Sequence, residues 1–298
     1  MSSNDVDISS LVDRLTSDPT TWSNSSLISV TQIAPSGLTL LYEIAMKMRD
    51  IVQSKGGDDR FQHKILASVF YEASTRTSCS FQTAMMRLGG KFIHIDASTG
   101  GNTSASKKGE SLADTIKCLQ CYTDVTVLRH GTQGKVAGVA LDEKMTKPVI
   151  NAGDGIGEHP TQALLDLFTI IDELKLLQGE QVETNEPLVV VLLGDLKHGR
   201  TVHSLAKLLA RSQSGFLKRR LVLRYCSPPS LQMPQYVKDY VKQCAESGNS
   251  DIIQEELTAN DEKTMGEVMR NSNVLYVTRV QKERFSSLDE YNKMKVRY

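Results

Sequence analysis

The chain has no excess of charge of either sign. Its 298 residues include 35 basic and 35 acidic side chains, so the formal net charge is zero. A protein that binds nucleic acid by neutralising phosphates usually carries a basic surface. The short basic cluster at residues 218–220 is too small to form one, so we expect no nucleic-acid partner.

Long hydrophobic runs are absent as well. No stretch of about 18 apolar residues occurs, so the sequence predicts no membrane-spanning helix and no membrane partner. The first ten residues, MSSNDVDISS, are polar and acidic. They lack the basic start and apolar stretch of a secretory signal, and they lack the arginines of a transit peptide. We therefore expect a cytoplasmic protein.

Cysteine is scarce and scattered. The five cysteines are an odd number in a long chain, which is unlike a secreted disulfide framework. Cys118 and Cys121 form a CxxC pair, but no second pair of Cys or His completes a four-ligand zinc site. We expect both to be small buried side chains on a helix, and we expect neither a metal nor a cofactor.

Strand-like apolar runs alternate with amphipathic segments in two series, which the predicted helix over 159–177 separates. Such alternation is typical of βαβ units around a parallel sheet. We therefore predict an α/β fold of two domains, 1–160 and 161–298, each a mostly parallel sheet flanked by helices. Strands are expected over 65–71, 91–96, 124–129, 147–151, 188–194, 221–226 and 273–278, and helices over 37–55, 81–88, 110–122, 135–144, 159–177, 201–212, 234–247 and 261–272.

Ligands of such sheets bind beyond the carboxyl ends of the strands, and we expect the active site in the cleft between the domains. Ser74, Thr75, Arg76 and Thr77 follow the first predicted strand and open a helix. Helix starts attract anions through unpaired N–H groups. Three hydroxyls and a guanidinium there predict a phosphate site, whereas the alternative is a simple helix cap beside a surface arginine.

Two further cationic stretches are more ambiguous. The small, polar loop 100–109 contains Lys107 and Lys108 and could cover a bound anion, although its residues alone favour a solvated surface loop. Arg129 ends the strand predicted over 124–129. That position suits an anion site at the edge of the sheet and a surface salt bridge equally well.

The remaining candidates also follow predicted strands. A glycine-rich turn leads into a helix whose first turn carries His159 and Gln162, three residues apart. An imidazole and an amide placed together can polarise a carbonyl and hold an amide; the alternative is a histidine with a purely structural hydrogen bond. In the second series, Arg200 and Arg279 follow two strands, and their fork-shaped donors would suit a substrate with two carboxylates.

Together these stretches resemble the catalytic chain of the aspartate carbamoyltransferase family, from about residue 35 onward. The resemblance is carried by FYEASTRTS, NTSASKKGESLADT, LRHG, NAGDGIGEHPTQALLDLFTI, GDLKHGRTVHSL and YVTRVQKER, which stand in the family's order. It implies transfer of the carbamoyl group of carbamoyl phosphate to the α-amino group of L-aspartate. The products would be N-carbamoyl-L-aspartate and phosphate, early in pyrimidine biosynthesis.

The same resemblance implies roles for individual residues. Arg76, Thr77, Lys108, Arg129 and His159 would be catalytic. Carbamoyl phosphate would be bound by Ser74, Thr75, Arg76, Thr77, Ser104, Lys108, Arg129, His159 and Gln162, and aspartate by Lys108, Arg200, Arg279 and Gln281. Ser104 and Lys108 match a loop that the family donates to a neighbouring subunit, which implies a homotrimer with shared active sites. It leaves any regulatory or pathway-enzyme partner undetermined.

One departure from the family is visible. The family pattern continues past RVQKER into an HPLP segment and final helices, and no HPLP follows before Tyr298. The sequence therefore leaves alternatives open beside an active enzyme. One is a truncated or impaired chain that binds carbamoyl phosphate or acts as a scaffold, and another is a carbamoyltransferase for a different amine.

Overall fold

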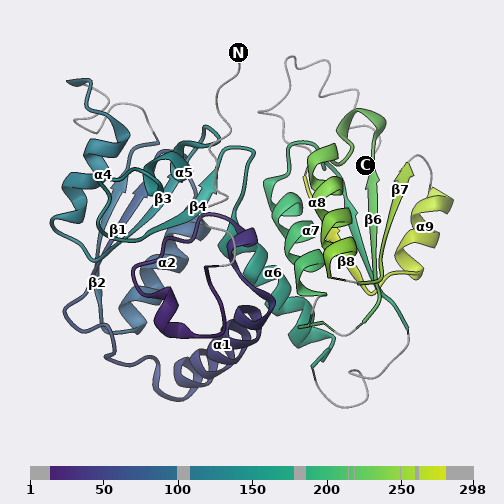
Figure 1. Cartoon of the computed structure of the whole chain (residues 1–298), viewed down its shortest axis with the longest axis horizontal. Helices are drawn as coiled ribbons and strands as arrows, with labels where there is room; N and C mark the ends of the chain where they lie inside the picture. The colour runs from purple at the N-terminus through teal and green to yellow at the C-terminus, as the bar shows by residue number, and fades with distance from the viewer. Residues whose placement is uncertain are drawn as a thin grey trace. The chain divides into compact units, whose positions relative to one another are not determined.

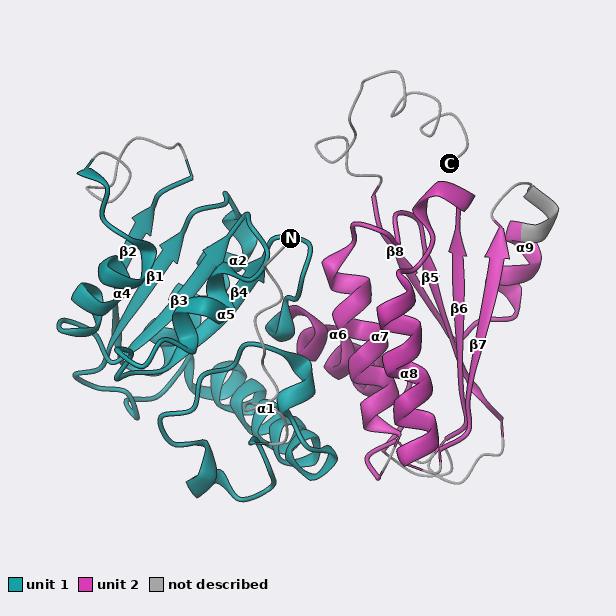
Figure 2. Ribbon diagram, turned by 45° about the horizontal axis from the view of Figure 1, so that its top comes forward, with its two compact units in different colours: residues 1–161 teal, residues 162–298 magenta. Residues whose placement is uncertain are grey.

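The computed structural model describes residues 14–98, 108–177, 186–213, 215–217, 219–248, 250–258 and 262–279. The site candidates Ser104 and Gln281 lie outside these residues. Internal contacts divide the chain into two compact units, Met1–Thr161 and Gln162–Tyr298, which Figure 2 colours separately. Within the described residues, no helix has both the length and the apolar character needed to cross a membrane.

Unit 1 is built on a parallel sheet of four strands in the order β2-β1-β3-β4 (Figure 1). The strands are β1 (Ile65–Phe70), β2 (Lys91–Asp96), β3 (Val125–His130) and β4 (Val149–Asp154). The helices are α1 (Pro35–Lys55), α2 (Thr75–Arg87), α4 (Leu112–Gln120) and α5 (Lys135–Ala140), with short 3-10 turns η2 (Pro19–Trp22) and η3 (Val30–Gln32).

Helices cover both faces of the central strands of this sheet, as the side chains of β1 show. Val69 belongs to a cluster with Ile116 of α4 and Val136 of α5. Its neighbour Phe70 points to the opposite face and packs with Met85 of α2. Since successive strand residues alternate between faces, a strand covered on both sides reads as an unbroken apolar run. This is why β1 could be predicted from ILASVFY.

Unit 2 repeats the architecture with a parallel sheet in the order β7-β6-β5-β8. Its strands are β5 (Leu188–Leu193), β6 (Leu221–Ser227), β7 (Ile252–Thr258) and β8 (Val274–Val277). Its helices are α7 (Arg200–Ser212), α8 (Gln235–Ser247) and α9 (Glu262–Arg270), with the short turn η5 (Pro229–Leu231). Helix α6 (Pro160–Glu173) starts at the end of unit 1 and runs into unit 2. The predicted fold class is confirmed.

Two local expectations were wrong, and one strand, β7, was not predicted. The helix predicted over 37–55 as an amphipathic segment is α1, but only its Gly37 and Leu38 are buried, and the apolar Ile44 is 37% exposed. Cys118 and Cys121 are exposed rather than buried, because α4 turns Ile116 and Gln120 toward the core instead.

Candidate active site

The carboxyl edge of the unit 1 sheet gathers the predicted phosphate-binding and carbamoyl-binding residues. Strands β1, β3 and β4 are parallel neighbours, so their carboxyl ends meet at one edge. Ser74–Thr77 follow β1, Arg129 lies near the end of β3 opposite Phe70, and His159 follows β4. The topology therefore brings together residues that are up to 85 positions apart in the chain.

The start of α2 does not behave as an ordinary capped helix. Ser74 occupies the N-cap position with extended backbone, but its side chain makes no capping hydrogen bond. Thr75 and Arg76 are exposed and Thr77 is half-buried. The N–H groups of the first turn are therefore not satisfied by Ser74, and they can receive an anion together with the adjacent hydroxyls and guanidinium.

Arg129 is a buried cation rather than a surface one. It is only 7% exposed. Its Nη1 donates to the Ala152 carbonyl oxygen at 3.0 Å, and its Nη2 lies 3.4 Å from Glu72 Oε1. These partners hold the guanidinium in one orientation at the edge of the sheet. The surface location that the salt-bridge alternative assumed is therefore wrong, although Arg129 does pair with Glu72.

The turn after β4 is anchored by a buried carboxylate. Asp154 accepts hydrogen bonds from the backbone N–H groups of Gly134 at 3.0 Å and Val136 at 3.3 Å. Burial raises the pKa of Asp154 above its ordinary value, against the effect of these N–H donors. His159 lies five residues further on and is only 5% exposed; its Nδ1 is 3.4 Å from Thr161 Oγ1. The histidine thus sits on a turn tied to the loop that follows β3.

Gln162 stands in the first turn of α6 and is oriented by Asp166. Its Nε2 donates to Asp166 Oδ1 at 2.9 Å. Because the amide nitrogen points toward this carboxyl group, the Gln162 carbonyl oxygen is turned away from it and can accept from an N–H group. Burial raises the pKa of Asp166. The sequence pattern did not single out Asp166 as a partner of Gln162.

The unit 2 sheet presents its own pair of cations at its carboxyl edge. Strands β5 and β8 are parallel neighbours, with Leu193 opposite Val277. Arg200 is the first residue of α7, which follows β5, and the exposed Arg279 lies two residues beyond the end of β8. Both guanidinium groups therefore come from segments that leave the same edge of one sheet.

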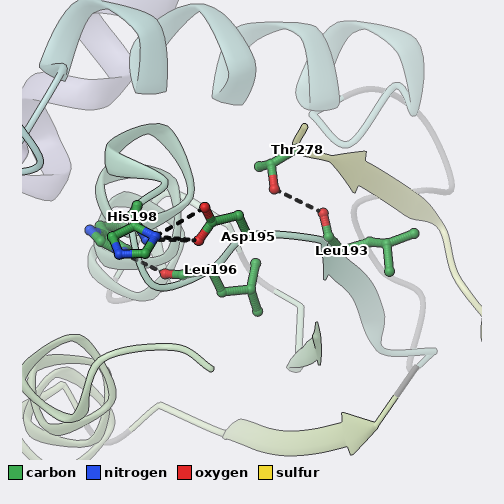
Figure 3. Close-up of polar contacts among 6 residues, drawn as sticks. Leu193, Asp195, Leu196, His198 and Thr278 are labelled. Carbon is green, nitrogen blue, oxygen red and sulfur yellow. Dashed lines mark hydrogen bonds and ion pairs between the residues drawn. The ribbon is translucent and has the colours of Figure 1, made fainter. Parts of the chain in front are cut away.

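The loop between β5 and α7 is held by two histidines (Figure 3). The carboxylate of the fully buried Asp195 accepts from the backbone N–H of His198 at 3.0 Å, and both of its oxygens lie 3.1 Å from His198 Nδ1. From α7, His203 Nε2 lies 2.6 Å from the Leu196 carbonyl oxygen. These bonds set the backbone from which Arg200 starts. The sequence did not predict these roles for His198 and His203. For His203, the available signal was a histidine among the apolar residues of 201–212.

The other candidates can be placed only partly. Lys108 is exposed and lies at the border of the described residues. The described residues contain no group of three or more His, Cys, Asp or Glu side chains arranged to hold a metal ion. Arg76 also lines a separate cavity of about 590 Å³ between α1 and α2, which is bordered largely by apolar side chains such as Met48 and Ile51. That lining is unsuited to a doubly charged phosphate.

The fold and these two sheet edges are consistent with the carbamoyltransferase resemblance, and comparisons with known proteins agree with it. Residues 25–172 match the "Aspartate/ornithine carbamoyltransferase, carbamoyl-P binding domain" family. The aspartate carbamoyltransferase catalytic subunit of Thermoplasma volcanium is 39% identical over 274 residues, which cover 90% of this chain and 77% of that protein. The chain belongs to the aspartate carbamoyltransferase family.

A solved structure and a much longer relative extend this similarity. Aspartate transcarbamoylase from Trypanosoma cruzi in complex with carbamoyl phosphate is 35% identical, with a TM-score of 0.78 over 93% of this chain and 79% of that chain. The same enzyme has been solved with N-(phosphonacetyl)-L-aspartic acid. "Multifunctional protein pyr1-3" of Dictyostelium discoideum is 46% identical over 90% of this chain. The chain spans only 11% of that relative's length.

Proposed function

We propose that the protein transfers the carbamoyl group of carbamoyl phosphate to the α-amino group of L-aspartate, giving N-carbamoyl-L-aspartate and phosphate. One observation carries the proposal: the uncapped start of α2, the buried Arg129 and the buried His159 share one edge of the unit 1 sheet. The family match over residues 25–172 covers the same elements. In this proposal unit 1 binds carbamoyl phosphate and unit 2 binds aspartate.

The donors at the unit 1 edge suit the charge changes of this reaction. The neutral amine of aspartate attacks the carbamoyl carbon, and the carbonyl oxygen becomes negative in the tetrahedral intermediate. Arg129, His159 and the Thr77 hydroxyl donate to that oxygen, and preorganised donors of this kind stabilise the transition state. The C–O bond to the phosphate then breaks. The phosphate leaves with its charge spread over Arg76 and Lys108, and it accepts the proton that the attacking amine loses. The carbonyl oxygen of Gln162 accepts from the carbamoyl amide.

Aspartate recognition is assigned to the unit 2 edge. Each guanidinium offers parallel N–H donors that match a carboxylate, so Arg200 and Arg279 would each bind one carboxylate of the substrate. Gln281 would complete this set. Two anions held in one geometry convert a bimolecular encounter into an effectively unimolecular one, which supplies much of the rate without a metal or cofactor.

The proposal also includes assembly and location. Ser104 and Lys108 would reach the active site of a neighbouring copy, so the active form would be a homotrimer. We place this homotrimer in the cytosol. The long multifunctional relatives support association with other enzymes of pyrimidine biosynthesis as a further part of the proposal.

Labelled carbamoyl phosphate and L-aspartate test the reaction directly. We expect labelled N-carbamoyl-L-aspartate, and the absence of product above background would contradict the proposal. N-(phosphonacetyl)-L-aspartic acid should protect the chain against heat. Protection without turnover would indicate instead a binding protein without catalytic activity.

An arginine variant tests the acceptor. Arg200→Ala should raise the KM for aspartate by about 10–100-fold, because a hydrogen bond between charged groups contributes about 1.5–3 kcal/mol. The matched control is Arg270→Ala, which removes an exposed arginine at the end of α9 and should leave KM unchanged. An unaltered KM in the Arg200 variant, or equal use of ornithine, would favour another amine acceptor.

A further inference from the structure

We propose that Glu158 is a positioning residue, which holds the peptide that carries His159 by clamping it to the N-terminal segment of the chain. The inference rests on the proposed function for the role of His159. Glu158 itself was not a site candidate in the sequence. Its side chain, however, connects the turn that carries His159 to the start of η3.

The Glu158 carboxylate uses both oxygens on the start of η3. Oε1 accepts from the Ser29 hydroxyl at 2.9 Å, and Oε2 accepts from the Val30 backbone N–H at 3.0 Å. These partners are 129 and 128 residues away in the chain. A two-point contact of this kind restricts the position and the rotation of the Glu158 side chain.

The Glu158 backbone is held as well. Its carbonyl oxygen accepts from the Asp154 backbone N–H at 3.2 Å and lies 3.4 Å from Asn151 Nδ2. The same Asn151 nitrogen donates to the Ile28 carbonyl oxygen at 2.9 Å. The carbonyl of Glu158 belongs to the peptide bond that joins it to His159. These contacts therefore act on an atom that is two covalent bonds from the His159 backbone nitrogen.

The segment that receives the carboxylate is rigid enough to act as an anchor. Leu27 adds to the free edge of β4, since its N–H donates to the Val149 carbonyl at 3.0 Å and its carbonyl accepts from the Asn151 N–H at 2.9 Å. Ser29 and Gln32 form a capping box around η3, and both are buried. Glu158 thus connects the turn that carries His159 to the segment 27–32, which is itself hydrogen-bonded to β4.

The chemistry of the clamp predicts which substitution it tolerates. Glutamine keeps one oxygen to accept from the Val30 N–H, and its amide nitrogen can donate to the Ser29 hydroxyl oxygen. Ser29 can accept this bond because its own proton can turn toward Thr31 Oγ1, 2.8 Å away. Alanine supplies neither partner and leaves the buried Val30 N–H without its acceptor.

The experiment compares Glu158→Gln, Glu158→Ala and the matched control Gln120→Ala. Gln120 is a buried side chain of α4 that accepts from the backbone N–H groups of Thr146 and Lys147 at 2.9 and 3.2 Å. Its removal should lower the Tm about as much as Glu158→Ala does, without touching the turn that carries His159. Steady-state kinetics are measured together with the ¹H–¹⁵N imidazole resonance of His159, which His159→Asn assigns.

We expect Glu158→Ala to lower kcat by about 10–100-fold with a smaller change in KM, because misplaced donors lose stabilisation mainly in the transition state. Its His159 resonance should shift, while Glu158→Gln should restore both. Equal kcat in Glu158→Ala and Gln120→Ala would overturn the inference, and so would a glutamine variant as impaired as the alanine variant. If the wild-type chain makes no product, the proposed function fails, and the His159 resonance still decides whether the clamp exists.

Discussion

Gly194 lies so close to Thr278 that a Cβ atom on the glycine would come within 2.4 Å of the Thr278 carbonyl oxygen. The backbone of Gly194 has a φ of +116°, which side chains of L-residues rarely adopt. Next to this contact the Thr278 N–H donates to the Leu193 carbonyl at 2.8 Å, and Figure 3 shows the accompanying bond from the Thr278 hydroxyl. The segments leading to Arg200 and Arg279 are therefore in direct backbone contact where they leave the sheet.

Substitution of this glycine should destabilise unit 2. Gly194→Ala must overcome both backbone strain and overpacking, so we expect a loss of about 2–4 kcal/mol in the free energy of unfolding. Gly131→Ala is the control, because nothing lies within 4 Å of a Cβ there and its φ is not in the left-handed region. Urea unfolding measures both. Equal midpoints for the two variants would show that the backbone relaxes at Gly194 at little cost.

His203 should be a second stability determinant of the loop before Arg200. The side chain is 1% exposed, and a carbonyl can only accept, so the His203 Nε2–H donates to Leu196. We expect His203→Ala to cost about 2–4 kcal/mol, since it leaves a cavity and an unsatisfied carbonyl group. Tyr236 is 51% exposed and its hydroxyl lies 3.2 Å from His203 Nδ1. Tyr236→Phe should therefore cost less than about 1 kcal/mol, and a larger loss than for His203→Ala would contradict this explanation.

The raised pKa of Asp166 predicts how its contribution to stability varies with pH. Burial is the largest cause of the shift. The relevant pH range lies between the pKa of Asp166 in the unfolded chain, about 3.9, and its raised pKa in the native protein. In this range the native state holds more protons than the unfolded state, so the free energy of unfolding falls as pH rises. Asp166→Asn removes this titration and retains an oxygen that can accept from Gln162.

Urea unfolding between pH 3.5 and 8 provides the measurement. The stability of the wild type minus that of Asp166→Asn should decrease as pH rises through this window and then become constant. The contributions of the other titrating groups are common to both proteins and cancel in this difference. A difference that rises with pH would mean that the pKa of Asp166 is lowered in the native protein.

Strand β7 shows why one element escaped prediction. Its residues, IIQEELT, lack both an unbroken apolar run and a regular alternation, because β7 is an edge strand whose residues are intermediate or exposed. Partners on β6 support it: Arg224 Nε donates to Glu255 at 2.6 Å, and the Tyr225 hydroxyl donates to Gln254 at 2.7 Å. The residues in each pair are about 30 positions apart in the chain, so a short-range sequence pattern cannot reveal that they interact.

The candidate site was predictable to the extent that its residues follow buried strands. Arg129 could be placed at the end of a strand from DVTVLR, but its burial depends on the Ala152 carbonyl and on Glu72, which other segments supply. The orientation of Gln162 is set by Asp166, four residues further along the chain. Asp166 lies within the family string NAGDGIGEHPTQALLDLFTI, but the string alone does not indicate that it bonds to Gln162.

The amino-acid sequence by itself determined the two series of parallel strands and helices, because buried strands and amphipathic helices leave short-range periodic patterns. It also placed hydroxyls, guanidinium groups and an imidazole directly after those strands. The tertiary structure alone decided which strands are neighbours, that Arg129 and His159 are buried, and that Glu158 reaches Ser29 and Val30. Such hydrogen bonds join residues that are remote in the chain, and their strength comes from exclusion of water, which no local pattern records.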